Sequence, residues 1–449
     1  TCLLFTNNSV KCFGDIAALG LGYTDGNGAG DGYLETGDYM PFWPMPAGRN
    51  VSQIAAGGEH TCAILDDGSM TCWGGNAEGQ LGMGNTTDLG TQTDQVGDSV
   101  AYVSLPTGVT VSAMALGKAH TCVLYDDGNV ACWGDNAYGQ LGDGTNTSQS
   151  SPTGVDLGEN NSAVMIGVGK THTCAVLQDA SVSCWGYNIH GQIGDGTNTQ
   201  RNAPSSVDLG QGRSAVAISL GESHTCALLD DQSLKCWGHN NEGQLGDGTN
   251  TNANSPVTVS LSGDIPVAVT TGEQHTCAVL SDETIACWGW NDRGQLGDGT
   301  LTSQSSPTSI TIDIGVTALT AGDRHTCAIL DNGTAMCWGN NIFGQLGNGA
   351  NSNSQIPVHV DSIYNVVGMV AGDHHTCAVK QGSGAWSQSG YVYCWGGNNE
   401  GQLGDGTTSS TNAPGIAIGS LTLALDDRDR DNDGIVDIYD THIANDEDG

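Results

Sequence analysis

Residues 120–145 read HTCVLYDDGNVACWGDNAYGQLGDGT, and this stretch decides the fold because the chain repeats it. A second copy, HTCALLDDQSLKCWGHNNEGQLGDGT, stands at residues 224–249. The first cysteines of successive copies lie 60, 60, 52, 52, 51, 50 and 50 residues apart. A period of this length is typical of propellers and solenoids, in which one unit cannot bury its apolar face alone. The chain is therefore a repeat protein, and the fold of one unit is the first thing to predict.

Each unit contains four short apolar segments that indicate β-strands. In residues 51–106 they are VSQIAAGG, TCAIL, MTCWG and AYVSLP. If the DDG of residues 66–68 forms a three-residue hairpin loop, Cys62 lies directly opposite Cys72, which predicts a disulfide. The alternative is a metal site made by these two cysteines and His60, although zinc signatures usually contain closer cysteine pairs. The predicted disulfides are Cys2–Cys12, Cys62–Cys72, Cys122–Cys132, Cys174–Cys184, Cys226–Cys236, Cys277–Cys287, Cys327–Cys337 and Cys377–Cys394.

A histidine before the first cysteine and a tryptophan after the second also recur, and their repetition favours structural roles. The alternatives are a ring of imidazoles that acts on a ligand and a tryptophan platform that binds one. In GQLGDGT, a residue such as Asp143 or Asn348 is predicted to close a turn, with cation binding as the alternative. The recurring residues are His60, His120, His172, His224, His275, His325 and His375, with Trp73, Trp133, Trp185, Trp237, Trp288, Trp338 and Trp395.

The repeat resembles that of the regulator of chromosome condensation family. The phrase GxxHTCALLxDGxxxCWGxNxxGQLGDGT, followed by a proline and a short strand, returns across about residues 1–420. The resemblance implies an all-β fold, a circular β-propeller of four-stranded blades, here with one cross-strand disulfide per blade. Paired cysteines are not general in the family's nuclear members, and the family commonly closes with seven blades.

We expect eight blades, with seven as the alternative. Eight strands of the HTC type, eight of the CWG type and eight next to a proline occur, but only seven of the AAG type. The segment LTLALDD, residues 421–427, stands where the missing strand would follow, and its pairing with the first hairpin would close the ring and remove exposed sheet edges. The propeller domain is therefore predicted to span residues 1–427.

Charge and cysteine content limit the compartment and the partners. The formal net charge is −37, from 49 acidic and 12 basic residues, so the chain repels nucleic acid, and the family's chromatin-binding and nucleotide-exchange roles are not expected. Paired cysteines in every repeat predict an extracellular or cell-surface location. No apolar run has the length of a membrane span. Because Thr1 opens in mid-motif, the sequence is predicted to be a mature or partial piece.

Residues 428–449 form a separate acidic segment with the spacing of a calcium loop. Carboxylates stand at loop positions 1, 3, 5, 9 and 12, a glycine at position 6, and position 7 offers its carbonyl oxygen. Asp replaces the usual final Glu, so the segment resembles thrombospondin type 3 or dockerin loops more than an EF-hand. The alternative is an acidic linker. The predicted calcium ligands are Asp429, Asp431, Asp433, Ile435, Asp437 and Asp440.

No catalytic constellation stands out, because the polar residues repeat in every unit whereas an active site needs a singular arrangement. We therefore expect a non-enzymatic, extracellular structural or adhesive module of a cell-surface protein or appendage, which binds a protein partner or copies of itself. The alternative is a secreted recognition module or enzyme inhibitor that binds on one propeller face. The first two units carry insertions, and Phe42 and Trp43 in the first are predicted to anchor the partner.

Overall fold

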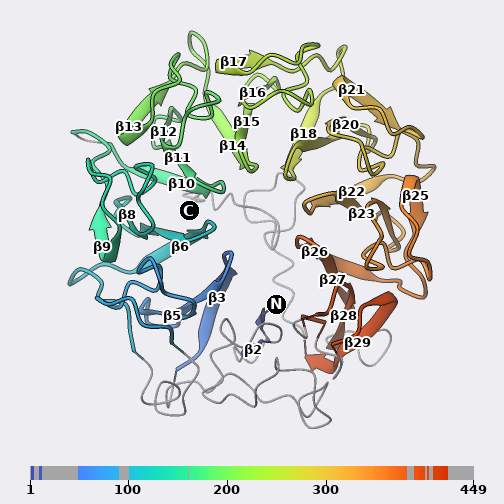
Figure 1. Cartoon of the computed structure of the whole chain (residues 1–449), viewed down its shortest axis with the longest axis horizontal. Helices are drawn as coiled ribbons and strands as arrows, with labels where there is room; N and C mark the ends of the chain where they lie inside the picture. Colours follow the sequence, from blue (N-terminus) through green and yellow to red (C-terminus); the bar gives the residue numbers. More distant parts are fainter. Residues whose placement is uncertain are drawn as a thin grey trace, which may run out of the picture.

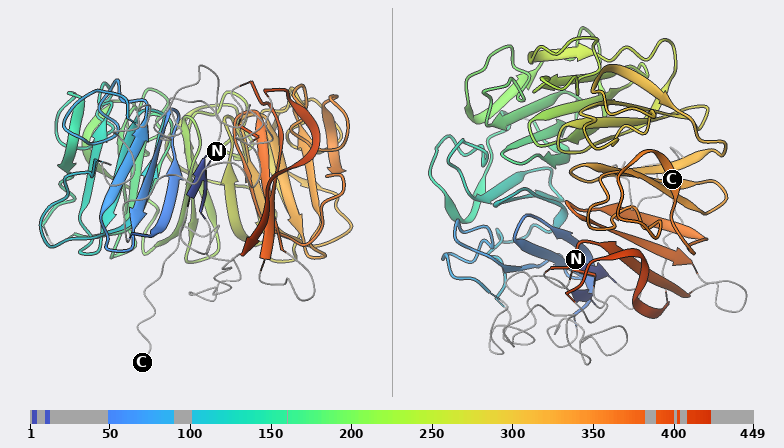
Figure 2. Two further views of the ribbon diagram at one scale, coloured as in Figure 1. Left: turned by 90° about the horizontal axis from the view of Figure 1, so that it is seen from below. Right: turned by 45° about the vertical axis from the view of Figure 1, so that its right-hand side comes forward.

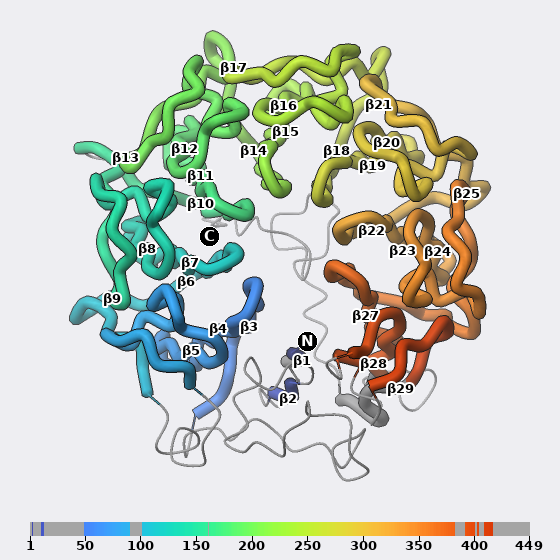
Figure 3. The backbone as a smooth tube through the Cα atoms, viewed as in Figure 1, coloured from blue at the N-terminus to red at the C-terminus, as the bar shows by residue number. Residues whose placement is uncertain are grey.

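The computed structural model describes residues 2–4, 10–12, 49–89, 101–159, 161–381, 389–399, 402–403 and 408–422. In these parts antiparallel sheets stand in a ring around a central axis (Figure 1), and the ring is a flat disc in side view (Figure 2). The backbone passes from one blade to the next in sequence order (Figure 3). The all-β propeller fold is confirmed.

Each complete blade has an inner strand, two hairpin strands and an outer strand, in sequence order. The inner strands are β3 (Val51–Ala56), β6 (Val111–Leu116), β10 (Ala163–Val168), β14 (Ala215–Leu220), β18 (Pro266–Thr271), β22 (Val316–Ala321) and β26 (Val366–Ala371). The first hairpin strands are β1 (Cys2–Leu4), β4 (His60–Leu65), β7 (His120–Tyr125), β11 (His172–Leu177), β15 (His224–Leu229), β19 (His275–Leu280), β23 (His325–Leu330) and β27 (His375–Gln381). The second hairpin strands are β2 (Val10–Cys12), β5 (Met70–Gly74), β8 (Val130–Gly134), β12 (Val182–Gly186), β16 (Leu234–Gly238), β20 (Ile285–Gly289), β24 (Ala335–Gly339) and β28 (Ser389–Gly396). The outer strands are β9 (Gln149–Gly154), β13 (Arg201–Val207), β17 (Ala253–Thr258), β21 (Gln304–Ile310), β25 (Ser354–His359) and β29 (Thr411–Thr422).

The expectation of eight blades is wrong, and the alternative of seven is confirmed. Within the described residues, six sheets have four strands and the β3–β5 sheet has three. The first hairpin, β1–β2, is a sheet of two strands and not a blade. Its residues Val10 and Cys12 nevertheless contact Val51, Leu65 and Trp73 of the β3–β5 blade. The hairpin therefore covers an apolar blade face without being a complete blade itself.

The segment LTLALDD does not supply a strand to the first hairpin where the structure describes it. Leu421 and Thr422 belong to β29, where they pair with Gly390 and Ser389 of β28. The last hairpin is longer than the others, because its two cysteines are 17 positions apart in sequence in place of 10. The longer β28 gives β29 additional partners, so the chain continues straight along its own blade. Residues 423–427 lie outside the described residues.

The expected fourth strand at residues 101–106 is also absent from the β3–β5 blade. Leu89 forms an isolated bridge with Gly74 at one end of β5, while Val103 donates a backbone hydrogen bond to Met70 at the other end. Two separate segments therefore share the edge that one outer strand covers in the other blades.

All eight predicted disulfides are confirmed. Each pair of cysteines lies directly opposite in its hairpin, as Cys62 does to Cys72, with Cα atoms 4.1 Å apart. This separation is slightly shorter than the roughly 4.5 Å of an ordinary opposed pair, so the strands approach a little at each bridge. The three-residue loop therefore set the register correctly.

The cores lie between successive blades. In β7 and β8, Cys122 and Cys132 contact residues of the next blade, whereas Val123, Ala131 and Trp133 contact the previous one. This division follows from the strand geometry, because successive side chains point to opposite faces of a sheet. The blades therefore bury both faces, and the tryptophans pack between blades, which confirms their predicted structural role.

Candidate functional site

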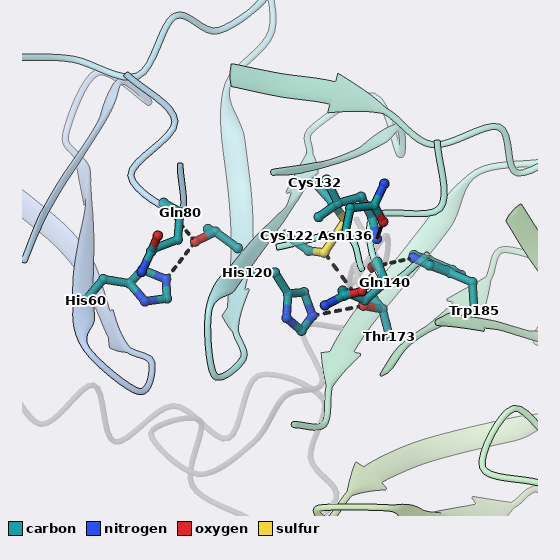
Figure 4. The surroundings of a disulfide bond; sticks show 11 residues. His60, Gln80, His120, Cys122, Cys132, Asn136, Gln140, Thr173 and Trp185 are labelled. Carbon is teal, nitrogen blue, oxygen red and sulfur yellow. Dashed lines mark hydrogen bonds between the residues drawn. A yellow bond between two sulfur atoms is a disulfide. The ribbon is translucent and has the colours of Figure 1, made fainter. Parts of the chain in front are cut away.

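The recurring histidine, threonine, glutamine and tryptophan form one hydrogen-bonded unit at the junction of two blades (Figure 4). The His120 Nε2 atom lies 3.2 Å from the Thr173 hydroxyl of the next blade. That hydroxyl donates to the Gln140 backbone oxygen at 3.0 Å, and Trp185 Nε1 donates to the same oxygen at 3.0 Å. The His–Thr bond recurs at 2.8 to 3.0 Å in His60–Thr121, His172–Thr225, His224–Thr276, His275–Thr326 and His325–Thr376.

The histidine tautomer follows from the partners. A threonine hydroxyl has one hydrogen, and at all six junctions it goes to the glutamine carbonyl. The histidine must then donate its Nε2 hydrogen to the threonine oxygen. The Nδ1 atom carries a lone pair and has no hydrogen-bond partner among the described residues. These six imidazoles are therefore neutral donors that join blades, and their predicted structural role is confirmed.

Burial keeps these rings neutral. It lowers the pKa of His60, His172, His224 and His325 to about 3, and that of His120 and His275 to about 4. A glycine makes room for each ring. A Cβ atom on Gly169 would lie 2.2 Å from His172 Cε1 and 2.7 Å from the Gly221 oxygen. Only glycine fits where the ring, the inner strand and the next blade meet.

The GDGT segment is a turn, as predicted. Asp143 Oδ1 accepts hydrogen bonds from the Thr145 backbone nitrogen at 2.9 Å and hydroxyl at 2.8 Å. Asn348 accepts from the Ala350 nitrogen at 3.2 Å in the same way. In the described ranges, no group of three or more His, Cys, Asp or Glu residues could hold a metal ion.

One face of the disc differs between blades although its backbone is the same. It is built where the loop before each recurring histidine meets the residue after CWG. In all seven blades this residue donates a backbone hydrogen bond across the two loops, as Tyr187 does to Thr171 at 3.0 Å and Trp290 to Gln274 at 2.9 Å. We call the side chains of these loops the variable face. The residues after CWG are Gly75, Asp135, Tyr187, His239, Trp290, Asn340 and Gly397.

Aromatic and imidazole rings follow one another around the variable face. The ring centroids of Tyr138 and Tyr187 lie 4.7 Å apart, and those of His190 and His239 lie 4.5 Å apart. Both pairs span neighbouring blades. Burial lowers the pKa of both histidines. Tyr138 and the neighbouring Ile189 are 37% and 55% exposed. This arc of half-buried rings is a suitable contact surface for a protein or another ligand with flat or apolar groups.

Charged residues lie on the same face. The Arg324 guanidinium lies 4.2 Å over the Trp290 ring, and its Nε is 3.3 Å from Glu273 Oε2. On another pair of blades, Lys170 forms an ion pair with Glu222. Burial, followed by the nearby carboxylates of Asp373 and Glu273, raises the pKa of Asp323 to about 6. The variable face therefore combines rings with carboxylates that influence one another.

Comparison with known proteins identifies the family. A family model described as "RCC1-like domain" matches residues 9–378, and one described as "Regulator of chromosome condensation (RCC1) repeat" matches residues 389–420. The chain belongs to the RCC1-like family.

Relatives of this RCC1-like propeller include the ultraviolet-B receptor UVR8 of Arabidopsis thaliana, which is 33% identical over 60% of each chain. The human E3 ubiquitin-protein ligase HERC2 is 29% identical over 57% of this chain but only 5% of its own length. The chain thus spans less than two thirds of these relatives. RCC1-like propellers act as binding or exchange-factor modules, and the similarity to HERC2 concerns that part alone.

Solved structures have the same fold. Human WBSCR16 gives a TM-score of 0.63 at 22% identity, covering 76% of this chain and 90% of its own. Yeast RCC1 (Prp20), solved bound to Kap60, gives 0.60 at 19% identity, covering 80% and 83%. At these identities the likeness concerns the fold.

Two predicted sites of the RCC1-like chain lie outside the described residues. These are the partner anchors Phe42 and Trp43 and the six calcium ligands from Asp429 to Asp440. Sequence reasoning missed the variable face. The signal was available, because the x positions of CWGxNxxG and GxxH are those at which near-identical repeats disagree. None of the described elements is a helix long and apolar enough to cross a membrane.

Proposed function

We propose that this RCC1-like propeller is an extracellular protein-binding module, part of a cell-surface protein or surface appendage with a structural or adhesive role. One observation carries the proposal: a frame of recurring contacts holds a face whose side chains differ around the ring. The frame consists of the disulfides and the hydrogen bonds that join histidine, threonine, glutamine and tryptophan. The side chains of the variable face take no part in these bonds. A singular surface on a symmetric scaffold is what specific binding requires.

Eight disulfides, buried except for the half-buried Cys2, support an oxidising, extracellular environment, since such bonds rarely persist in the cytosol. The proposal also includes a second domain, residues 428–449, that binds calcium like a thrombospondin type 3 repeat and stiffens a stalk. Removing calcium with a chelator should then increase protease cleavage after Arg428 and Arg430 while the propeller stays intact. Equal cleavage with and without calcium would reduce the segment to an acidic linker.

A second candidate is a secreted recognition module or inhibitor that acts as a single disc. The aromatic arc favours it, because an arc of rings on one face fits a compact partner better than a repeating fibre contact. In either case Phe42 and Trp43 are proposed as additional partner contacts.

The location and the two candidates can be tested together. Thiol trapping before lysis, followed by protease treatment of intact cells, should find no free thiol and should release propeller fragments. Free thiols in the native protein would overturn the extracellular proposal. Electron microscopy of the native material then separates the candidates: ordered fibres or surface arrays support the structural role, whereas dispersed discs support the recognition module.

A further inference from the structure

Carboxylates are concentrated on one half of the variable face. In the GxxH segment, the residue directly after the glycine is acidic in four consecutive blades and is lysine in the two blades before them. These residues are Lys118, Lys170, Glu222, Glu273, Asp323 and Asp373.

The protein's own cations neutralise only part of this charge. Lys170 pairs with Glu222, and Arg324 pairs with Glu273. Asp323 and Asp373 have neither an ion pair nor a side-chain hydrogen bond within the described parts of the chain. Asp323 is only partly exposed, and the raised pKa described above shows that its charge is poorly accommodated. A cation from outside would remove this repulsion.

The adjacent Arg324 demonstrates how this face holds a guanidinium. Its flat group lies over the Trp290 ring while its Nε contacts the Glu273 carboxylate, so ring and carboxylate act together. Guanidinium groups favour this combination because they stack on rings and bond carboxylates in a fixed plane.

The next pair of blades offers the same elements without an internal arginine. The ring centroids of Phe343 and His374 lie 5.2 Å apart, beside Asp373 in sequence, and Ile342 is 55% exposed. We call Asp323, Asp373, Phe343 and His374 the acidic patch. It presents two unpaired carboxylates next to two rings.

A buried amide next to Phe343 also lacks a partner among the described residues, as do the corresponding Gln192 and Gln295 amides of two other blades. Gln345 is fully buried, its Oε1 accepts from the Phe343 nitrogen at 3.0 Å, and its Nε2 has no hydrogen-bond partner among the described residues. In the β6–β9 blade, Gln140 makes the same Oε1 contact with Tyr138, and its Nε2 donates at 2.8 Å to Asp135 on the variable face. The Gln345 amide is therefore directed at the same face, where an acceptor such as a peptide carbonyl would satisfy it.

We propose that the acidic patch binds an arginine side chain from a basic segment of a partner protein. The proposal rests on the variable face being a binding surface and adds the chemistry of the partner. A peptide carries both the guanidinium that the carboxylates and rings select and the carbonyl that the buried amide lacks. A second copy fits poorly, because a net charge of −37 on each chain opposes their approach.

The test uses a fluorescein-labelled heptapeptide of alternating glycine and arginine, titrated with the full chain and followed by fluorescence anisotropy. A citrulline version keeps the shape and hydrogen bonds of the side chain but removes its charge. The variant Asp323→Asn/Asp373→Asn removes both patch charges. The control Asp282→Asn/Asp331→Asn makes the same charge change in the hairpin loops at the opposite end of two blades. Its turns should persist, because Asn332 already caps Thr334 as Asp282 caps Thr284.

The arginine peptide should bind the native chain and the control variant equally. Its Kd should rise at least about tenfold for the patch variant, and the citrulline peptide should bind the native chain about tenfold more weakly. Equal binding of the two peptides, or equal loss in patch and control variants, would overturn the proposal. The proposal would also be overturned if the arginine peptide failed to bind and another interaction depended on the patch instead. The interactions to be tested are binding of calcium from calcium chloride alone, binding of a neutral hexasaccharide, and self-association in sedimentation velocity. These results would leave the extracellular proposal untouched, because that stands or falls on thiol trapping and protease accessibility.

Discussion

At mildly acidic pH, the blade-joining histidines should become protonated only when the propeller unfolds. In the fold, burial holds the pKa of the six rings at about 3 or 4, whereas their ordinary value is 6.5. Because the folded pKa lies below the unfolded one, the stability from these groups is fully present above 6.5 and is lost as the pH falls towards the folded values. At about pH 5.5 each unfolded histidine binds about 0.9 proton and each folded one almost none.

The six histidines together should therefore take up about 5.4 protons when the protein unfolds near pH 5.5. Asp323 should release about 0.7 proton on unfolding, since its pKa is raised to about 6 in the fold. His375, whose pKa is lowered in the fold, should take up about 0.9 proton. The hairpin-loop aspartates with lowered pKa values, such as Asp67 and Asp282, are ionised in both states at this pH. The lowered pKa values of His190 and His239 act in the same direction, so the expected total is at least about five to six protons. Each histidine loses about 1.4 kcal/mol of stability per pH unit, so six lose about 8 kcal/mol at one unit below 6.5.

The assay is calorimetric unfolding in two buffers of different ionisation enthalpy, without reductant, which gives the proton uptake directly. The variant His172→Gln, whose amide can still donate to Thr225, should reduce the uptake by about 0.9 proton. The variant His359→Gln is the control, because its side chain is exposed at the end of β25, away from the blade junctions. An uptake below about two protons, or an equal effect of the two variants, would refute the neutral, blade-joining role of the histidines.

Three further predictions concern the frame and the acidic patch. Intact mass before and after reduction should show sixteen protected cysteines, and Cys226→Ser/Cys236→Ser should lower the free energy of unfolding by about 2–4 kcal/mol in denaturant titration. Gly169→Ala should cost about 1–3 kcal/mol, because its Cβ would overlap the His172 ring, whereas Gly154→Ala should be neutral, because nothing lies within 4 Å of its Cβ position. Asp323→Asn should raise the Tm at pH 7.5 and have no effect near pH 5, where the native carboxyl is already protonated; a gain of equal size at both values would contradict the raised pKa.

The blade could be predicted from the sequence because its rules are local. A three-residue loop and a side-chain period of two placed Cys62 opposite Cys72, and the alternation of CW put the tryptophan on the other face. The predictions failed where the choice was between two partners for one strand. Residues 421–422 pair with β28 because the last hairpin is longer and offers more backbone partners, which no local sequence pattern reveals.

The candidate site was not predictable in the same way. Its contacts join residues about one repeat apart, as Arg324 and Glu273 do, and such pairs depend on the spacing between blades. Sequence comparison within the chain shows only where the repeats differ. That signal would have identified the loops of the variable face, but not that rings gather on one arc and unpaired carboxylates on another.

The acidic patch differs from the blade junctions because its carboxylates are not paired with a cation among the described residues. At the six described blade junctions the histidine Nε2–H and the threonine hydroxyl each have an acceptor, and the glycines leave room for the rings. At the patch, Asp323 is partly buried beside Asp373 and Glu273, and the Gln345 amide nitrogen has no partner among the described residues. The carboxylates do not help the ring to close, since two other blades hold lysine at the position of Asp323, namely Lys118 and Lys170. The glutamine amide is paired in some blades, as Gln140 is with Asp135, and unpaired in others, at Gln192 and Gln295. Strain that a repeat protein could have removed by copying a neighbouring blade is retained when selection acts on binding, which is why the patch is the first surface on which to seek the partner.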